Sequence, residues 1–497
     1  MAAPLEVPET FDVLIVGAGV SGIDVAYRLQ EGRPGKSFTI LEARNAIGGT
    51  WDLFRYPGVR SDSDMATFGF PFRPFRGKSI ADGASIQCYI EETAREFGID
   101  RHIRFGHRVV GASWCSDEAR WTVEVETDAG RAFLTGRFVS VCAGYYDYER
   151  GYEPVLPSAD RFAGPIVHPQ HWPSDLVVAG KRVVVIGSGA TAVTLVPELA
   201  ARGADVTMLQ RSPSYVLAIP SVDPIARWLG RTLPRRLTDR LVRWKNIGIS
   251  TLLYGFARRR PAVARRMLLK GVSRALGPGH DVERDFGPAY NVWDQRLCLV
   301  PDGDLFAAIR KGRASVVTDT VEMFTEHGIQ LSSGRAIEAD IIVTATGFVI
   351  KLMGGIAFDI DGVAQDFSKK LIYKGMMLSG MPNFAFGFGY TNASWTLKCD
   401  LSARYVVRLL NHLDGHRYAS ATPVPAGDVE PQPMVNFTSG YVKRAAAMLP
   451  RQGLRAPWRL HQNYLLDWAG FSFGRIEDGT MRFARKTLRR GEVSLPT

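Results

Sequence analysis

The chain has 497 residues, of which 46% are hydrophobic and 22% charged, and its formal net charge is +11. This length is too great for one compact core and predicts two or three domains, while the composition is that of an ordinary globular protein. Because no apolar run approaches the roughly 20 residues that cross a bilayer, and no signal-peptide pattern leads the chain, we expect a cytoplasmic protein.

The cysteines are five in number, dispersed along the chain, and never arranged as a C-x-x-C pair. An odd, scattered set of this kind indicates reduced thiols rather than a disulfide framework. We therefore expect neither structural disulfides nor a metal site.

A buried strand, a glycine-rich turn and a helical pattern follow one another from Phe11 to Gln30. In the Gly17-x-Gly19-x-x-Gly22 turn, the first glycine permits a tight bend and the second lets the backbone approach a pyrophosphate. The third allows the helix to pack closely on the strand. Glu42 ends a second strand that begins at Phe38, where a carboxylate can hold a ribose hydroxyl. The unit predicts a dinucleotide site, at which we also expect Ser21, Gly49, Thr50, Trp51 and Val109.

The same order of elements returns between Lys181 and Ser212. Its turn is Gly187-x-Gly189-x-x-Ala192, and the following strand ends in Arg211 and Ser212 where the first unit has an acid. A carboxylate would repel a 2′-phosphate, whereas Arg211 can bind one with paired N–H donors. We therefore expect NADPH here and FAD at the first unit. In the plainer interpretation, Arg211 only ends a strand at the surface. The other residues expected at the NADPH site are Ser188 and Thr191.

Two such units predict an α/β fold with two Rossmann-like dinucleotide-binding domains, one for FAD and one for NADP. A helical insertion, broken by prolines, is expected in the NADP domain. The chain would cross between the domains near Cys142–Gly144 and again at Thr346-Gly347. The predicted ranges are 1–150 and 346–497 for the FAD domain with a C-terminal tail, 151–222 and 291–345 for the NADP domain, and 223–290 for the insertion.

Two longer motifs lie between the nucleotide sites: residues 48–62 read GGTWDLFRYPGVRSD, and residues 162–173 read FAGPIVHPQHWP. They match the patterns [A/G]GxWxxxx[F/Y]P[G/M]xxxD and FxGxxxHxxxW(P/D), so the chain resembles the Baeyer–Villiger monooxygenases, and it does so over nearly its full length. The resemblance implies that a flavin C4a-peroxide, formed with NADPH and O₂, oxidises hydrophobic ketones to esters and thioethers to sulfoxides. The fingerprint residues that carry it are Phe162, Gly164, His168 and Trp172.

The resemblance also implies a catalytic pair. A permanently charged guanidinium can stabilise a peroxide anion and then the oxyanion of a ketone adduct. By resemblance this guanidinium is that of Arg296, and its orienting carboxylate is that of Asp62, the last residue of the first motif. The plainer interpretations are an interface ion pair for Arg296 and a turn residue for Asp62, with Asp64 two positions away.

His168 and Trp172 are expected to be structural rather than catalytic, with His168 hydrogen-bonded in the connection between the domains. Gln295 stands where many relatives of this kind carry lysine, which would leave NADPH selection more dependent on Arg211. We expect the substrate pocket to be shaped by Lys374–Met381 and Gly389–Leu397.

Two other activities remain open for the same fold. One is N- or S-oxygenation without ketone oxidation, and the other is an NADPH oxidase that oxygenates no substrate. A disulfide reductase is excluded, because that chemistry needs the redox-active cysteine pair that the sequence lacks.

The positive charge is concentrated between Ala226 and Ala275, which hold fourteen Lys or Arg against one acid. An apolar stripe at helical spacing accompanies it. The pattern is typical either of contact with an anionic membrane or of a solvated helical subdomain over the active site. No nucleic-acid-binding fold accompanies the charge, so we expect no nucleic-acid partner. The stripe comprises Trp228, Leu229, Leu233, Leu237, Leu241 and Trp244.

Overall fold

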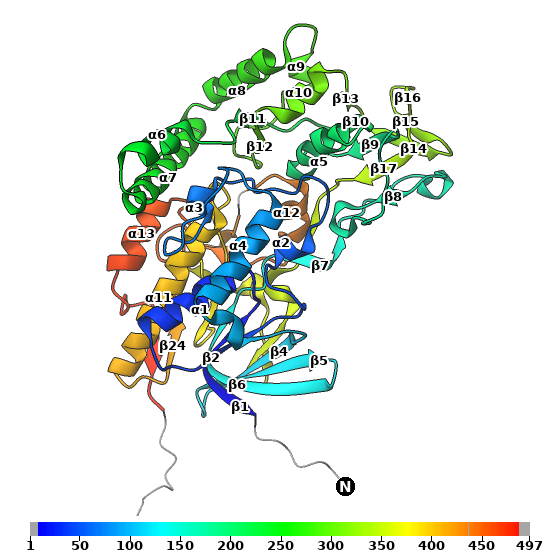
Figure 1. The fold of residues 1–497 in the computed structure, drawn as a ribbon. Coiled ribbons are helices and arrows are strands. Elements are labelled where there is room, and N and C mark those ends of the chain that lie inside the picture. The colour runs from blue at the N-terminus through cyan, green and yellow to red at the C-terminus, as the bar shows by residue number, and fades with distance from the viewer. Residues whose placement is uncertain (1–7, 436, 487–497) are drawn as a thin grey trace, which may run out of the picture.

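The structure is a computed structural model that describes residues 8–435 and 437–486. Both ends of the chain build the lower part of the molecule in Figure 1, and the middle of the chain builds the upper part. The last part of the predicted C-terminal tail, residues 487–497, lies outside the described residues.

The lower part contains a nine-stranded sheet that includes β1 (Glu9–Val16). β1 lies parallel to β2 (Phe38–Leu41) and β6 (Gly130–Val141), as the first dinucleotide-binding unit requires. The strand order is β20-β19-β4-β5-β6-β1-β2-β3, and β23 also pairs with β6. The remaining strands are β3 (Ile103–Arg104), β4 (Arg108–Cys115), β5 (Arg120–Thr127), β19 (Ala357–Ile360), β20 (Val363–Ala364) and β23 (Phe384–Phe386).

Three helices cover one face of this sheet: α1 (Val20–Gly32), α4 (Gly83–Glu96) and α11 (Trp395–Gly415). α11 comes from the far end of the chain, yet its Asp400 pairs with the buried Arg28 of α1, at 2.9 Å between Nε and Oδ1. This buried ion pair fixes the position of α11 along α1, because separating the two charges in the core would cost free energy.

The upper part is built on a parallel five-stranded sheet of order β13-β10-β9-β17-β8. α5 (Ala190–Ala201) follows β9 directly, which reproduces the strand–turn–helix of the first unit. The strands are β8 (Ile166–Val167), β9 (Arg182–Ile186), β10 (Asp205–Gln210), β13 (Ala314–Thr318) and β17 (Ile341–Thr344), with an antiparallel hairpin sheet of β14 (Val321–Thr325), β15 (Gly328–Leu331) and β16 (Ala336–Glu338) beside them.

The predicted helical insertion forms four helices at the top and upper left of Figure 1. Asp223 caps the first of them through its side chain, and Pro234 begins a new helix. The predicted apolar stripe is therefore not on one continuous helix: Pro234 divides it, because proline lacks the N–H that a helix interior needs. Across the described residues no helix is long and apolar enough to cross a membrane. The helices are α6 (Pro224–Thr232), α7 (Arg235–Arg259), α8 (Pro261–Leu276) and α9 (Val282–Phe286).

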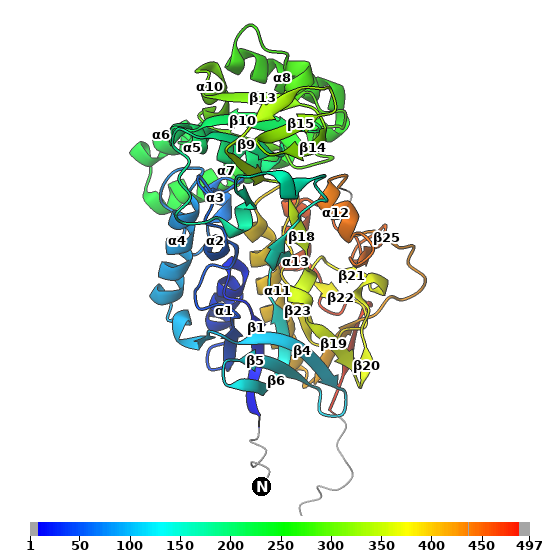
Figure 2. The ribbon, with the colours of Figure 1, turned by 90° about the vertical axis from the view of Figure 1, so that its right-hand side faces the viewer.

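Two short antiparallel strands, β7 (Tyr146–Gly151) and β18 (Phe348–Ile350), connect the two parts. Figure 2 shows them between the lower sheet and the upper one. Further elements are α2 (Thr50–Leu53), α3 (Met65–Phe68), α10 (Asp304–Arg310), α12 (Gly440–Ala445), α13 (Tyr464–Phe473), β11 (Val216–Ile219), β12 (Cys298–Pro301), β24 (Ser420–Pro423) and β27 (Met481–Ala484).

Candidate functional site

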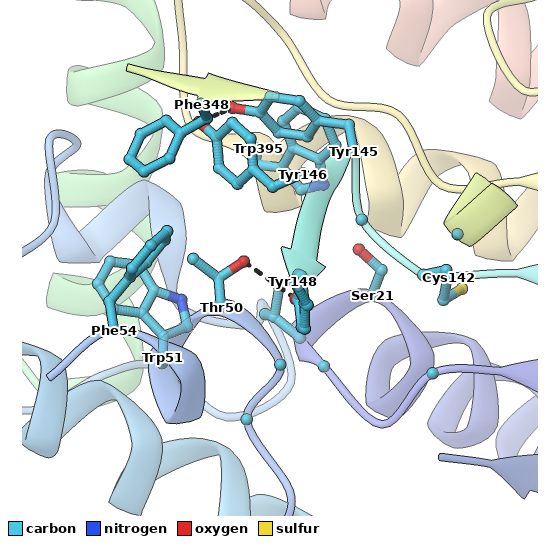
Figure 3. Close-up of a pocket in the computed structure, with 18 of the residues that line it drawn as sticks. Ser21, Thr50, Trp51, Phe54, Cys142, Tyr145, Tyr146, Tyr148, Phe348 and Trp395 are labelled. Atoms are coloured by element: carbon cyan, nitrogen blue, oxygen red, sulfur yellow. Dashed lines mark hydrogen bonds between the residues drawn. The ribbon is translucent and has the colours of Figure 1, made fainter. Parts of the chain in front are cut away.

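A cavity of about 530 Å³ lies between the two parts of the molecule and takes side chains from both. The lower part contributes the glycine turn and Glu42, and the upper part contributes Thr191, Thr194 and Arg296. Figure 3 shows a group of aromatic rings on one side of a pocket, with Thr50, Trp51 and Phe54 facing them.

The floor of the cavity at one end is the turn between β1 and α1. Gly17 has φ +101°, a conformation that favours glycine. A Cβ on Gly22 would lie 1.9 Å from the Gly17 carbonyl oxygen, so no larger residue fits without movement of the backbone. The bare backbone and the N-terminus of the 13-residue α1 together suit a pyrophosphate.

Glu42 lies next to this turn and is buried. Its Oε2 accepts a hydrogen bond of 2.6 Å from the Ala18 N–H, and its Oε1 accepts one of 2.9 Å from the Arg44 N–H. Burial raises the pKa of Glu42 above its ordinary value, against the effect of these bonds. The two bonds hold the carboxylate on the cavity wall, where each oxygen keeps a second lone pair for a ligand hydroxyl.

The residues of the first motif continue the wall. Gly49, with φ +57°, approaches Gly19 so closely that a Cβ would lie 3.2 Å from the Gly19 Cα. The Thr50 hydroxyl is 3.3 Å from that of Tyr148, and the Trp51 ring packs edge-on against Phe68. The structure thus brings Gly17, Gly19, Ser21, Glu42, Gly49, Thr50, Trp51, Asp62, Val109, Thr191 and Arg296 into one cavity.

Arg296 and Asp62 form an ion pair on the wall of this cavity, although 234 residues separate them. Asp62 raises the pKa of the Arg296 guanidinium, and the phenols of Tyr145 and Tyr146 act in the same direction. Asp64 does something different: its carboxylate accepts from the Thr67 N–H at the start of α3. Of the two acids, Asp62 is therefore the one that pairs with Arg296.

An aromatic wall lines the same cavity, and the sequence motifs did not single it out. Tyr145 stacks on Trp395 with ring centres 4.8 Å apart, and Tyr146 lies 4.6 Å from Phe348. The Tyr145 and Tyr146 hydroxyls are 2.5 Å apart (Figure 3), and burial raises the pKa of Tyr145 to about 12. The available signal was the pair of tyrosines that directly follows the predicted domain crossing at Cys142–Gly144.

Of the two segments predicted to shape the substrate pocket, one contributes to this cavity and the other does not. Trp395, from the segment Gly389–Leu397, lines the cavity. No residue of Lys374–Met381 does. That segment is apolar enough to enter the core of the lower part, where Met377 and Leu378 form β22 and are fully buried.

The second glycine turn has the same shape but an open outer side. A Cβ on Gly187 would lie 2.4 Å from the Ala345 carbonyl oxygen, whereas one on Gly189 would meet nothing within 4 Å. The Ser188 hydroxyl donates to the Ser212 carbonyl at 2.8 Å. Arg211 and Ser212 are exposed at the end of β10, and within the described residues Arg211 has no acidic partner. Gly187, Ser188, Gly189, Ala192, Arg211 and Ser212 lie outside the cavity wall.

The fingerprint residues lie outside the cavity wall, and His168 is the one among them that bonds the connection between the two parts. His168 Nε2 is 3.2 Å from the Gly347 carbonyl oxygen, and its Nδ1 accepts from the Gln170 N–H. Burial lowers the pKa of His168. A Cβ on Gly164 would lie 2.4 Å from the Asp340 carbonyl oxygen, while Phe162 is buried and Trp172 packs against the core of the upper sheet.

Comparison with known proteins identifies the family. Residues 10–225 match the model of the "flavin-binding monooxygenase-like" family. The chain is 53% identical to the FAD-containing monooxygenase EthA of Mycolicibacterium smegmatis, over 98% of this chain and 99% of that protein. It is 48% identical to the probable FAD-binding monooxygenase AlmA of Acinetobacter baylyi, over 96% of each. The chain belongs to the flavin-binding monooxygenase family.

Membership of the flavin-binding monooxygenases confirms the predicted class, an FAD- and NADPH-dependent monooxygenase. Solved structures confirm the predicted fold class. The chain superimposes with a TM-score of 0.71 on a steroid monooxygenase bound to NADP, at 21% identity over 96% of this chain and 100% of that one. The TM-score is also 0.71 for the NADP⁺-bound cyclohexanone monooxygenase of Rhodococcus sp. Phi1, at 19% identity over 96% and 100%.

Proposed function

We propose that this flavin-binding monooxygenase inserts an oxygen atom into apolar ketones in a Baeyer–Villiger reaction, and that it also oxidises thioethers to sulfoxides. The observation that carries the proposal is the Arg296–Asp62 ion pair on the wall of a cavity that the first glycine turn also lines.

The cavity fits the FAD that the family requires. The bare glycine turn and the N-terminus of α1 would hold the pyrophosphate, Glu42 the ribose, and the Gly49–Trp51 segment the remainder. Bound FAD, once reduced by NADPH, supplies the activation of O₂. The protein's own residues then have to orient the substrate, exclude water and stabilise negative charge.

Arg296 is suited to the last of these tasks. A guanidinium stays positive at any working pH, and Asp62 keeps it in one orientation. Negative charge that develops on a carbonyl oxygen beside it is stabilised strongly, because the donor is already in place before the reaction. Oxidation of sulfur places no such charge on the substrate, so it depends less on Arg296.

The aromatic wall favours an apolar substrate. Tyr145, Tyr146, Phe348 and Trp395 present ring faces and edges, and the paired hydroxyls of the two tyrosines offer one polar contact among them. A ketone or thioether with an apolar body matches this arrangement better than a charged metabolite.

Arg211 is proposed to bind the 2′-phosphate of NADPH. It is exposed at the end of β10, on the strand that follows the second glycine turn, where the ribose of a nucleotide held by that turn would lie. His168 is proposed to be a structural residue of the connection between the two parts, since it bonds the backbone there and does not reach the cavity.

The test uses flavin-loaded protein with NADPH, air, a panel of cyclic and aliphatic ketones and a phenyl thioether, with products measured by mass spectrometry. We expect Arg296→Ala to lose at least about 100-fold in ester formation, the usual cost of one preorganised donor, and much less in sulfoxide formation. Arg296→Lys should restore only part of the ketone activity.

Arg258→Ala is the matched control. Arg258 forms an exposed ion pair with Asp294, two residues before Arg296, without lining the cavity. An equal loss in both variants would reduce Arg296 to a structural ion pair. Sulfoxide without ester from the wild type would favour N- or S-oxygenation alone, and hydrogen peroxide as the sole product would favour an NADPH oxidase.

A further inference from the structure

The helical insertion presents many unneutralised positive charges on its surface. Ten of the fourteen cations between Ala226 and Ala275 are exposed and, across the described residues, contact neither an acid nor a backbone carbonyl. The exceptions are Lys245, Arg258 and Arg265, which pair with acids, and Arg243, which donates to carbonyls of the α3 region. The ten are Arg227, Arg231, Arg235, Arg236, Arg240, Arg259, Arg260, Arg266, Lys270 and Arg274.

Large apolar side chains are exposed among these charges. Trp228 of α6 is 63% exposed, and Leu252 of α7 is 74% exposed. Further along the same side, Phe473 of α13 is 73% exposed. The other exposed apolar residues of these helices are Ile225, Leu237, Leu241, Trp244, Ile249, Leu253, Phe256, Leu465 and Leu466.

The three helices share one face of the molecule, on the left of Figure 1. Trp244 of α7 and Trp468 of α13 have ring centres 5.9 Å apart, and Trp468 in turn contacts Phe473 at 5.3 Å. The exposed apolar residues of α7 and α13 are thus continuous, although more than 200 residues of chain separate them. We call the exposed surface of α6, α7 and α13 the basic–apolar face.

We propose that the basic–apolar face binds the surface of a membrane that contains anionic lipids. Helices that lie in the bilayer interface combine exposed Trp, Phe and Leu with basic side chains, and this face combines them with arginines. A second copy of the chain is a poorer occupant, because two such faces would bring their positive charges together. Contiguous exposed apolar side chains of this kind also mark surfaces that contact a protein or a membrane.

Such binding would place the membrane close to the cavity. The inner side of α7 packs on the lower part, where the buried Ile247 contacts Tyr390 and Leu397, near the cavity residue Trp395. A helix is about 10 Å across, so one helix would separate the lipid surface from this wall. An apolar compound dissolved in the bilayer would then be concentrated near the site.

The test is co-sedimentation of the flavin-loaded protein with vesicles of phosphatidylcholine alone or with about 30% phosphatidylglycerol. We expect binding to the anionic vesicles only, and release in about 0.5 M NaCl, which screens surface charge. Arg235→Glu/Arg236→Glu/Arg240→Glu should lower the partition coefficient by roughly 100-fold or more. The control Arg101→Glu/Arg161→Glu/Arg335→Glu makes the same charge change at exposed sites outside the face and should bind as the wild type does.

A second pair of variants tests the apolar contribution. Leu252→Ser/Leu253→Ser should weaken vesicle binding, whereas Phe133→Ser/Val155→Ser, at sites 51% and 97% exposed elsewhere, should not. Flavin absorbance reports folding in every variant. Wild-type protein that stays in the supernatant at low salt would overturn the proposal. Equal vesicle binding by the two charge variants would also overturn it. The same holds if the protein does not bind vesicles and Leu252→Ser/Leu253→Ser reduces the size of its oligomer.

Discussion

The two glycine turns share a backbone plan and differ in what surrounds it. The first turn ends against a buried carboxylate, Glu42, inside a cavity that the upper part of the molecule closes. The second ends near an exposed guanidinium, Arg211, with an open side at Gly189. Enclosure suits a cofactor that stays bound through many turnovers, and openness suits one that has to arrive and leave.

The helix that follows the first turn also packs more closely on its turn than the helix that follows the second. The third position of the first turn is Gly22, where a Cβ would lie 1.9 Å from the Gly17 carbonyl oxygen. In the second turn the equivalent residue is Ala192, which is fully buried without difficulty. The methyl group of Ala192 therefore keeps α5 slightly farther from its glycine turn than α1 is from the first turn.

The largest expected effect comes from adding that methyl group to the first turn. Gly22→Ala should lose most of its bound flavin, because the turn has to open to admit the Cβ. Gly189→Ala adds a methyl group to the second turn in open space, so it should keep its flavin and show only weaker use of NADPH. The ratio of flavin to protein absorbance after purification measures the difference. Full flavin content in Gly22→Ala would contradict the comparison.

A smaller effect is expected from Arg211→Ala. Loss of a charged hydrogen bond to the 2′-phosphate should raise KM for NADPH by about 10- to 100-fold and leave KM for NADH unchanged. Flavin content should stay normal, since Arg211 lies away from the cavity. Arg202→Ala, at the opposite end of α5, serves as the control. If the substitution changes KM for NADPH and KM for NADH equally, Arg211 is only a surface residue, and other residues select NADPH.

The smallest effect concerns the connection between the two parts. Burial lowers the pKa of His168, so the folded protein keeps this ring neutral at a pH where the unfolded chain protonates it. Its contribution to stability is complete above the unfolded pKa of about 6.5 and is lost as the pH falls through the lower folded value. His168→Gln should lower the Tm at pH 7.5 while making the further loss on acidification to pH 5.5 smaller, by about 1–2 °C. Thermal melts of both proteins at the two pH values measure this difference. If the pH dependence of Tm is unchanged in the variant, groups other than His168 cause the acid sensitivity.

Local sequence determined a large share of this protein. The spacing of glycines after an apolar strand predicts both nucleotide-binding units, because the steric demands of such a turn involve only neighbouring residues. The absence of acid near Arg211 and the concentration of positive charge in residues 226–275 are also visible directly in the chain. The pairing of Asp62 with Arg296 was accessible only through resemblance, since no local rule connects residues so far apart.

Tertiary structure decided the rest. It brings Tyr145 and Tyr146 beside Trp395, buries Met376, Met377 and Leu378 in the core instead of in the pocket, and places α13 against α7 to extend the basic–apolar face. Each of these depends on which apolar surfaces meet when the chain folds. Periodicity shows that a segment has a face to bury, but only packing in three dimensions selects its partner.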